Sequence, residues 1–381
     1  MKKINPSYGA KLLLSIFLGG TLSLIFLGHR YIDRQTDFAD AATLGAQTTS
    51  FFAKKNGYPI HCQTDAEIKG CVQGVLVRNS SKQVIWLGNS QLHAINHFRP
   101  GDLNAPAILA NALAPLGADV VTVSQPNANL QEQFIIFEYL RSKFPIQRLL
   151  LPVVFDDFRE DGLRDDVRTL LQDSEFVRSL PIQAQDLKIT AKTNARSKIE
   201  EVQSTPQSYV EGELDHFLER NWPLWRARPQ MRGDLFIGLY RFRNRVFGIT
   251  PSTKRKIIPS HYERNWQALE ALVKSAVAAK INVVLYVAPI GGTAAERPYV
   301  DSEYKEFKEA LKTLAKSNSI DFVNFEDIVA PELWGDKAST SGETGVEVDF
   351  MHFTGAGHEV LAEALYQRLL THGSSARGGQ N

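Results

Sequence analysis

The clearest architectural signal in this chain is VIWLGNSQ, residues 84–91. Its first four residues are apolar and do not alternate with polar ones, as expected of a parallel strand that is buried on both faces. Gly88 then breaks the strand and Ser90 follows almost at once. Reactive groups gather beyond the carboxyl ends of the strands in open α/β sheets. The stretch therefore predicts a buried strand that presents Ser90 as a candidate nucleophile.

Four further apolar runs have the same character, and helical segments separate them. The predicted strands are residues 84–88, 118–123, 148–155, 281–289 and 320–325, and residues 130–144 and 304–318 have helical period. This alternation predicts an α/β fold with a doubly wound, mainly parallel sheet of about five strands.

The interval of about 160–280 contains no convincing core strand, so we interpret it as a helical insertion. Within it, Arg241, Arg243 and Arg245 lie among large apolar residues. Two interpretations stay open for them: a helix that packs on the core with solvated arginines, or a surface that contacts lipid headgroups or a membrane partner.

The N-terminus differs from the rest of the chain. Lys2, Lys3 and Lys11 precede an uncharged run over residues 12–28, whose length is at the short end of what spans a bilayer. We interpret this run as a transmembrane signal anchor, with a cleaved signal peptide or a buried helix as alternatives. The positive charge before it predicts a single-pass protein of the cytoplasmic membrane with its catalytic domain outside the cytoplasm.

The anchor sets the expected organisation of the chain. The predicted parts are a cytoplasmic N-terminus at 1–11, the anchor at 12–28, a stalk and lead-in at 29–80, the α/β domain at 81–371 and a flexible tail at 372–381. Cys62 and Cys71 lie close together, and an oxidising compartment would let them form a disulfide. Two unrelated thiols are the alternative.

Composition excludes several function classes. The chain has 381 residues, of which 22% are charged, and a formal net charge of +1, so no global field favours nucleic acid. It contains no Gly-rich phosphate loop and no Cys/His cluster with metal-ligand spacing. We therefore expect neither a metal nor a diffusible cofactor.

A second block, DFMH at residues 349–352, lies just before a predicted C-terminal helix. Asp349 and His352 supply a carboxylate and an imidazole, which are the groups that activate a serine nucleophile. Taken singly, a surface acid beside a histidine and a helix cap at Asn89-Ser90 are ordinary features. Their combination with Ser90 after the first core strand predicts a Ser90–His352–Asp349 triad.

The remaining site residues are tentative. The backbone N–H of Ser90 could face a developing oxyanion, and Gln91, His93, Asn127 and Asn129 are further oxyanion or substrate-binding candidates. Turn capping is the alternative for both asparagines, and helix packing is the alternative for His93. Two acids after the third strand, Asp156 and Asp157, would repel an oxyanion if ionised there. We expect them to orient the insertion through Arg159 or Arg164.

Gly88-Asn89-Ser90 and the later D-x-x-H of Asp349 and His352 resemble the signature blocks of the SGNH (GDSL-type) hydrolase superfamily. The resemblance covers roughly residues 82–160 and 280–370. It implies that Ser90 is the nucleophile, His352 the base and Asp349 the group that orients the base. The family also uses a glycine after strand two and an asparagine after strand three. This chain has SQPNAN (124–129) and DDFRED (156–161) there, without those two donors.

With its anchor, the chain is similar to the membrane-linked acyltransferase branch of that superfamily, which includes the D-alanyl-transfer protein of teichoic-acid modification and alginate-type O-acetyltransferases. The resemblance implies acyl transfer onto hydroxyls of an extracytoplasmic glycan or cell-envelope polymer, with a multi-spanning membrane O-acyltransferase as partner. Two alternatives remain open. One is a membrane-anchored esterase or deacylase with the same triad, and the other is a non-catalytic scaffold of a membrane complex.

Overall fold

A computed structural model describes residues 47–181, 246, 253–292, 297–338 and 346–374. All of these except Val246 belong to one compact unit. The predicted anchor at 12–28 and the arginine-rich segment of the insertion lie outside the described residues. Within the described ranges, no helix has both the length and the apolar character needed to cross a bilayer.

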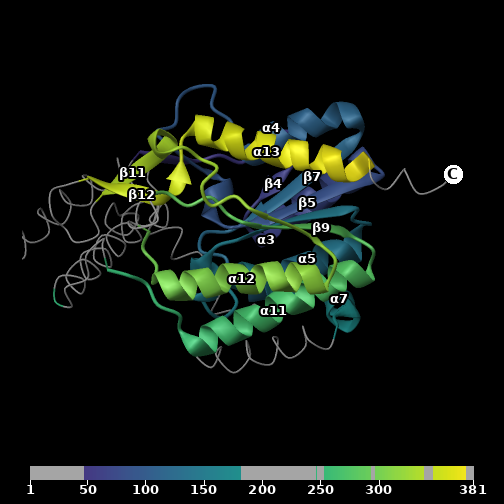
Figure 1. The fold of residues 1–381 in the computed structure, drawn as a ribbon. Helices are drawn as coiled ribbons and strands as arrows, with labels where there is room; N and C mark the ends of the chain where they lie inside the picture. Colours follow the sequence, from purple (N-terminus) through teal and green to yellow (C-terminus); the bar gives the residue numbers. More distant parts are fainter. Residues whose placement is uncertain (1–46, 182–245, 247–252, 293–296, 339–345, 375–381) are drawn as a thin grey trace, which may run out of the picture. The chain divides into compact units, whose positions relative to one another are not determined.

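At the centre of this unit is a six-stranded parallel sheet (Figure 1). Its strands, in spatial order, are β10 (Asp321–Asn324), β9 (Asn282–Val287), β8 (Arg148–Val153), β5 (Lys82–Gly88), β7 (Ala118–Ser124) and β4 (His61–Cys62). The five predicted strands are all present. The sixth, β4, is an edge strand of two residues, which is too short to produce a hydrophobic pattern.

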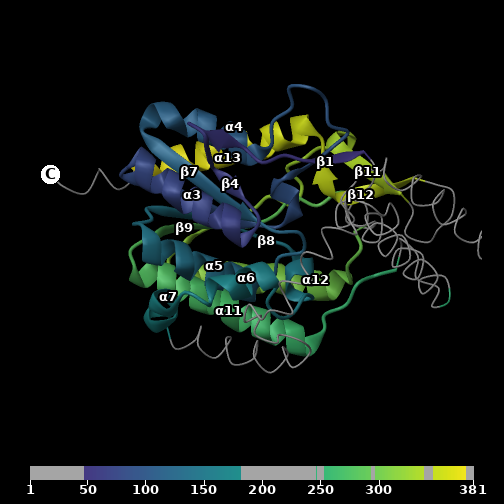
Figure 2. The ribbon, with the colours of Figure 1, turned by 180° about the vertical axis from the view of Figure 1, so that it is seen from behind.

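Helices cover both faces of the sheet (Figures 1 and 2). One face packs on α3 (Asp65–Arg78), α5 (Leu130–Lys143), α11 (Pro259–Ala278) and α12 (Asp301–Ser317), and the other packs on α4 (Ala105–Leu113) and α13 (Gly355–Ser374). Successive side chains of a strand point to opposite faces. In β5, Ile85 and Leu87 therefore join the first layer, whereas Val84 and Trp86 join the second.

The described part of the predicted insertion is helical. The short helices α6 (Asp165–Leu170) and α7 (Ser174–Ser179) pack near α5. In contrast, α11 contacts both α5 and β9 and fills the crossover that two parallel strands require. The insertion therefore ends before α11, because α11 is part of the α/β layer structure itself.

Short elements surround the carboxyl ends of the strands. Two antiparallel pairs lie there: β1 (Thr48–Ser50) with β6 (Ala94–Asn96), and β11 (Trp334–Ala338) with β12 (Val346–Phe353). The other short elements are β2 (Lys54–Lys55), β3 (Tyr58–Pro59), the 3₁₀ turns η1 (Ser90–Leu92), η3 (Phe155–Phe158) and η4 (Pro331–Leu333), and η2 (Ala114–Leu116), which leads into the amino end of β7 instead.

The predicted disulfide is confirmed. Cys62 and Cys71 are joined, which ties the edge strand β4 to α3. The same helix starts with a capping box between Thr64 and Glu67, which gives partners to the backbone N–H groups of both residues. These two features anchor His61, the residue before Cys62, at the sheet edge.

Candidate functional site: a serine, a histidine and an aspartate in one line

The structure brings Ser90, His352 and Asp349 together. Ser90 opens η1 directly after β5, and the other two residues lie on β12. The Ser90 Oγ atom is 2.9 Å from His352 Nε2, and His352 Nδ1 is 2.7 Å from Asp349 Oδ2. All three side chains are buried, with Ser90 only 7% exposed. The two sequence blocks therefore form one continuous hydrogen-bonded line.

A bulge in β12 makes this line possible. In a regular strand, residues three apart point to opposite faces, so Asp349 and His352 could not meet. The pairing of β11 with β12 shifts between Trp334, which faces Phe353, and Gly335, which faces Asp349. The residues between these two partners are extra, and such bulges re-aim side chains beside active sites.

The aspartate is held on both oxygens. Asp349 Oδ1 accepts the backbone N–H groups of Met351 at 2.9 Å and His352 at 3.2 Å, and Oδ2 faces the imidazole. Burial alone would raise the pKa of Asp349. The charge and hydrogen bond of His352, with the Met351 N–H and Lys337, nevertheless hold that pKa below its ordinary value. An ionised Asp349 fixes the proton of His352 on Nδ1 and leaves Nε2 to accept from Ser90.

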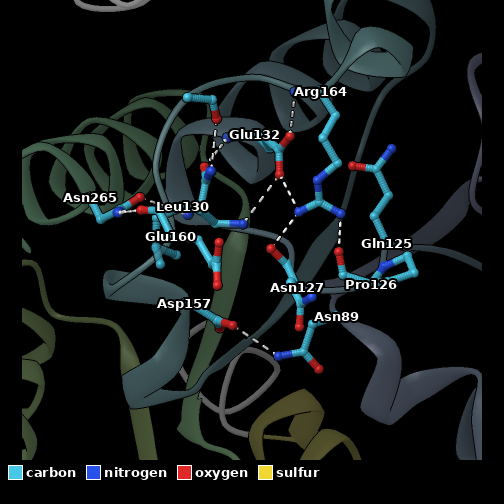
Figure 3. A network of polar contacts seen from close by, with 12 residues as sticks. Asn89, Gln125, Pro126, Asn127, Leu130, Glu132, Asp157, Glu160, Arg164 and Asn265 are labelled. Atoms are coloured by element: carbon cyan, nitrogen blue, oxygen red, sulfur yellow. Dashed lines mark hydrogen bonds and ion pairs between the residues drawn. The ribbon is translucent and has the colours of Figure 1, made fainter. Parts of the chain in front are cut away.

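The Ser90 turn, residues 89–92, is held through Asn89 from the end of the neighbouring strand β8 (Figure 3). Asn89 Oδ1 accepts the Gln91 N–H at 3.0 Å, and Asn89 Nδ2 donates to Asp157 Oδ1 at 2.9 Å. The other oxygen of Asp157 accepts the Val154 N–H at 3.1 Å. Burial raises the pKa of Asp157 to about 8, so at neutral pH this carboxyl is mostly protonated and carries little charge toward an oxyanion.

This arrangement corrects half of the expectation for the paired acids. Asp156 does contact Arg159, at 3.2 Å, and it also pairs with Arg255. The hydrogen bonds of the Asp157 carboxyl go to Asn89 and to the Val154 N–H, rather than to Arg159 or Arg164. This role has no local signal in the sequence, because η3 follows β8, which lies beside β5 in the sheet although far from it in the chain.

The amide groups proposed as oxyanion donors have other partners. Gln91 Nε2 donates to the carbonyls of Pro289 at 2.8 Å and Met351 at 3.0 Å. Asn129 caps α5 through its oxygen, while its Nδ2 donates to Gly162 O at 2.8 Å. Asn129 therefore acts as a helix cap, and Gln91 joins the Ser90 turn to β12.

Asn127 is exposed and has a left-handed backbone, with φ of 51°. Its carbonyl and that of Pro126 accept hydrogen bonds from the guanidinium of Arg164, which also pairs with Glu132 at 2.7 Å (Figure 3). Arg164 thus holds the loop between β7 and α5 by its backbone. Donation by the Asn127 side chain to a substrate stays a prediction.

His93 lies at the end of η1, completely buried, with Nδ1 at 2.7 Å from Ser124 Oγ.

Asn96, like Asp157, is a site residue that has no signal in the sequence. Its amide nitrogen lies 3.5 Å from Asp349 Oδ2. No group of three or more histidine, cysteine, aspartate or glutamate side chains in the described part of the chain is placed to hold a metal ion.

Comparison with known proteins gives only structural likenesses. No family model and no curated protein sequence matches the chain. Solved structures that resemble it include a GDSL-like lipase from Bacteroides thetaiotaomicron (12% identity, TM-score 0.36, 79% of this chain and 98% of that one), an acetylxylan esterase from Geobacillus stearothermophilus (11%, 0.38, 76% and 94%) and a lipase/acylhydrolase from Enterococcus faecalis (8%, 0.35, 76% and 95%). At identities and TM-scores this low they carry no conclusion about chemistry, which depends on the site itself.

Proposed function

We propose that this chain is a serine-dependent acyl-transfer enzyme with Ser90 as nucleophile, His352 as general base and acid, and Asp349 as the group that orients His352. The observation that carries the proposal is the hydrogen-bonded line from Ser90 Oγ through His352 to Asp349, at 2.9 and 2.7 Å. A nucleophile within hydrogen-bond reach of a base, which a third group orients, is the arrangement that activates a serine.

The first half of the reaction forms an acyl-enzyme. His352 Nε2 takes the proton of Ser90 while Oγ attacks the carbonyl carbon of an ester or thioester donor. The tetrahedral intermediate then collapses, the bond to the leaving alkoxide or thiolate breaks, and His352 returns the proton to that leaving group. Asp349 stabilises the imidazolium that forms between the two proton transfers.

The second half passes the acyl group to an acceptor hydroxyl. His352 removes the proton of the acceptor, whose oxygen attacks the Ser90 ester, and the proton then returns to Ser90 Oγ. Transfer requires that a bound hydroxyl react faster than water, which positioning of the acceptor can supply. With water as the acceptor, the same steps amount to ester hydrolysis.

The proposed acceptor is a hydroxyl of an extracytoplasmic glycan or cell-envelope polymer, and the proposed donor system is a multi-spanning membrane O-acyltransferase. Three features support this setting. They are the resemblance of the sequence blocks to the membrane-linked SGNH branch, the uncharged run at 12–28 behind Lys2, Lys3 and Lys11, and the Cys62–Cys71 disulfide, which suits an oxidising compartment.

Labelling by a fluorophosphonate probe tests the nucleophile. Wild type and the control Ser317→Ala, which removes a hydroxyl from α12, should be labelled and should turn over a chromogenic acetyl ester. Ser90→Ala should lose both. Labelling that persists in Ser90→Ala would refute the assignment of the nucleophile, and wild type that neither reacts with the probe nor turns over ester would favour a scaffold.

Competition between acceptors tests transfer against hydrolysis. The acyl-enzyme is supplied with oligosaccharides of the producing cell's envelope, and mass spectrometry measures acylated glycan against free acid. Transfer predicts acylated glycan that rises with glycan concentration. Release of free acid at a rate that glycan does not change would identify a hydrolase. In cells, a deletion strain complemented with Ser90→Ala should lack the envelope modification that wild type restores.

A further inference from the structure

The bulge of β12 contains Phe350 and Met351, at the point where the pairing with β11 shifts. A bulge leaves backbone groups without their ladder partners, so other parts of the chain have to supply new ones. Three such bonds are present here. The Met351 N–H donates to Asp349 Oδ1 at 2.9 Å, Phe350 O accepts the Gly291 N–H at 2.9 Å, and Met351 O accepts from Gln91 Nε2 at 3.0 Å.

The bond from Gln91 differs from the other two because it starts beside the nucleophile. Gln91 directly follows Ser90 in η1, and Met351 directly precedes His352 in β12. The second N–H of the same amide donates to Pro289 O at 2.8 Å, just beyond the end of β9. Gln91 is only 2% exposed, so water does not compete for these bonds. One buried side chain therefore links the neighbours of Ser90 and His352.

The backbone from which this side chain extends is itself held. The Gln91 N–H donates to Asn89 Oδ1 at 3.0 Å, and Asn89 Nδ2 donates to Asp157 at 2.9 Å. The His93 N–H closes the turn on Ser90 O at 3.1 Å. The Gln91 amide is therefore attached to a Ser90 turn whose own position is fixed from β8.

The loop after β9 approaches the bulge very closely. A Cβ atom at Gly291 would lie 2.9 Å from Phe350 Cα and 2.9 Å from a ring atom of Trp334, so this approach requires glycine. Pro289, whose carbonyl accepts the second bond of Gln91, belongs to the same loop. Gln91 therefore binds both the bulge and the loop that packs against it.

The contact between Ser90 and His352 needs such a link, because the two residues come from different sheets. The strand before Ser90, β5, pairs with β7 and β8, whereas β12 pairs with β11. The bond from Ser90 Oγ to His352 Nε2, at 2.9 Å, breaks and reforms as the proton moves during the reaction. Other contacts must therefore keep these two atoms at reacting distance.

We propose that Gln91 is a positioning residue, which fixes the separation of Ser90 and His352 through its bonds to Met351 O and Pro289 O. This inference rests on the proposed function and deepens it. It replaces the expectation that Gln91 binds the oxyanion or the substrate, because both of its amide N–H groups already have acceptors. A displacement of about 1 Å between reacting groups can lower a rate by about 100-fold, which sets the size of the expected effect.

The test uses two substitutions of Gln91 and one matched control. Gln91→Met removes both donors and keeps a side chain of similar length. Gln91→Glu keeps the shape of the side chain but, when ionised, turns an acceptor toward two carbonyl oxygens. The control is Gln83→Met. Gln83 lies near the other end of β5, is also 2% exposed, and also donates through Nε2 to a backbone carbonyl, that of Ser80 at 3.0 Å.

We expect Gln91→Met to lower kcat for a chromogenic acetyl ester by about 100-fold, with KM close to that of wild type. The rate of labelling by the fluorophosphonate probe should fall by the same factor, because that reaction needs Ser90 and His352 but no acceptor. The acid limb of the pH profile of kcat/KM should keep its midpoint, because the substitution removes no charge. Gln91→Glu should lose at least as much kcat. Gln83→Met should keep the wild-type kcat, although its thermal midpoint falls.

Three outcomes overturn the inference and leave the triad standing. They are a wild-type kcat in Gln91→Met or Gln91→Glu, a higher KM with unchanged kcat, which would place Gln91 against the substrate, and an equal loss of kcat in Gln83→Met, which would indicate a general effect of disturbing β5. Gln91→Glu decides the question where Gln91→Met does not fold. Wild type that neither reacts with the probe nor turns over ester would instead refute the proposed function, and this inference with it.

Discussion

Replacing Asp157 with asparagine separates the charge of this side chain from its hydrogen bond to Asn89. Asparagine keeps an oxygen that can accept from Asn89 Nδ2, as Asp157 Oδ1 does at 2.9 Å. It places an amide where Asp157 Oδ2 accepts the Val154 N–H at 3.1 Å. Because the buried Val154 N–H is then left without an acceptor, this change should cost about 1–3 kcal/mol at every pH.

The pH-dependent part has a definite sign. Burial raises the pKa of Asp157 from an ordinary 3.8 to about 8. Between these values the folded protein holds a proton that the unfolded chain has released, so wild-type stability falls as pH rises, by about 1.4 kcal/mol per pH unit. Asparagine does not titrate. Relative to wild type, Asp157→Asn should therefore gain about 3 kcal/mol between pH 5 and pH 7.

Urea unfolding of both proteins at pH 5, 6 and 7 measures this difference. A third variant, Asp157→Leu, also removes the titration but cannot hold Asn89. We expect Asp157→Asn to keep kcat/KM within about tenfold of wild type. In Asp157→Leu, kcat/KM should fall by about 100-fold, because the turn at residues 89–92 is then misplaced. A difference in unfolding free energy between Asp157→Asn and wild type that does not change with pH would refute the reasoning, since it would mean that the carboxyl is already ionised in the folded protein.

Three further expectations follow from the same contacts. Asp349→Asn should lower kcat by about 10³- to 10⁴-fold, because an amide cannot stabilise the His352 imidazolium. Single-turnover acylation measures this rate. A loss below tenfold would contradict the role of Asp349. Replacing Cys62 and Cys71 with serine should lower the free energy of urea unfolding by about 3 kcal/mol, and an unchanged midpoint would show that the disulfide does not constrain the unfolded chain. Burial, with a contribution from His358, lowers the pKa of His61 from 6.5 to about 3. The neutral imidazole therefore contributes its full share to the free energy of unfolding above pH 6.5, and this share is lost as pH falls toward 3. That loss should reach about 2 kcal/mol at pH 5. In His61→Gln, the free energy of urea unfolding should depend less on pH between 5 and 6.5. A dependence equal to that of wild type would show that His61 is not neutral in the folded protein.

The strands and the triad residues were the most predictable parts of this protein. Apolar runs such as 84–88 and 118–123 become buried parallel strands, because a segment without a polar face cannot remain at the surface of a sheet. Ser90, Asp349 and His352 were expected as a triad from two short blocks, since their residue types are those that acyl chemistry needs. Of the interval expected as an insertion, α6 and α7 are described as helices, whereas α11 belongs to the layer structure.

Several features of the site have no local signal. The bulge in β12 depends on where β11 pairs with it, and without that pairing D-x-x-H in a strand would point its two functional groups apart. Asp157 supports Asn89 because β8 happens to lie beside β5. Sequence reasoning could place these acids after a strand but could not tell which neighbour they meet.

The order of residues along this chain was enough to indicate the α/β class and to single out Ser90, His352 and Asp349, which the fold brings into hydrogen-bond contact, because hydrophobic periodicity and functional residue types are local properties. Tertiary contacts decided which polar groups have hydrogen-bond partners and which do not. Asn129 and Gln91 have partners, whereas His93 Nε2 has none in the described part of the chain. The physical reason is that a buried hydrogen bond is made with whatever the sheet brings near, and here those partners come from strands and turns far apart in sequence.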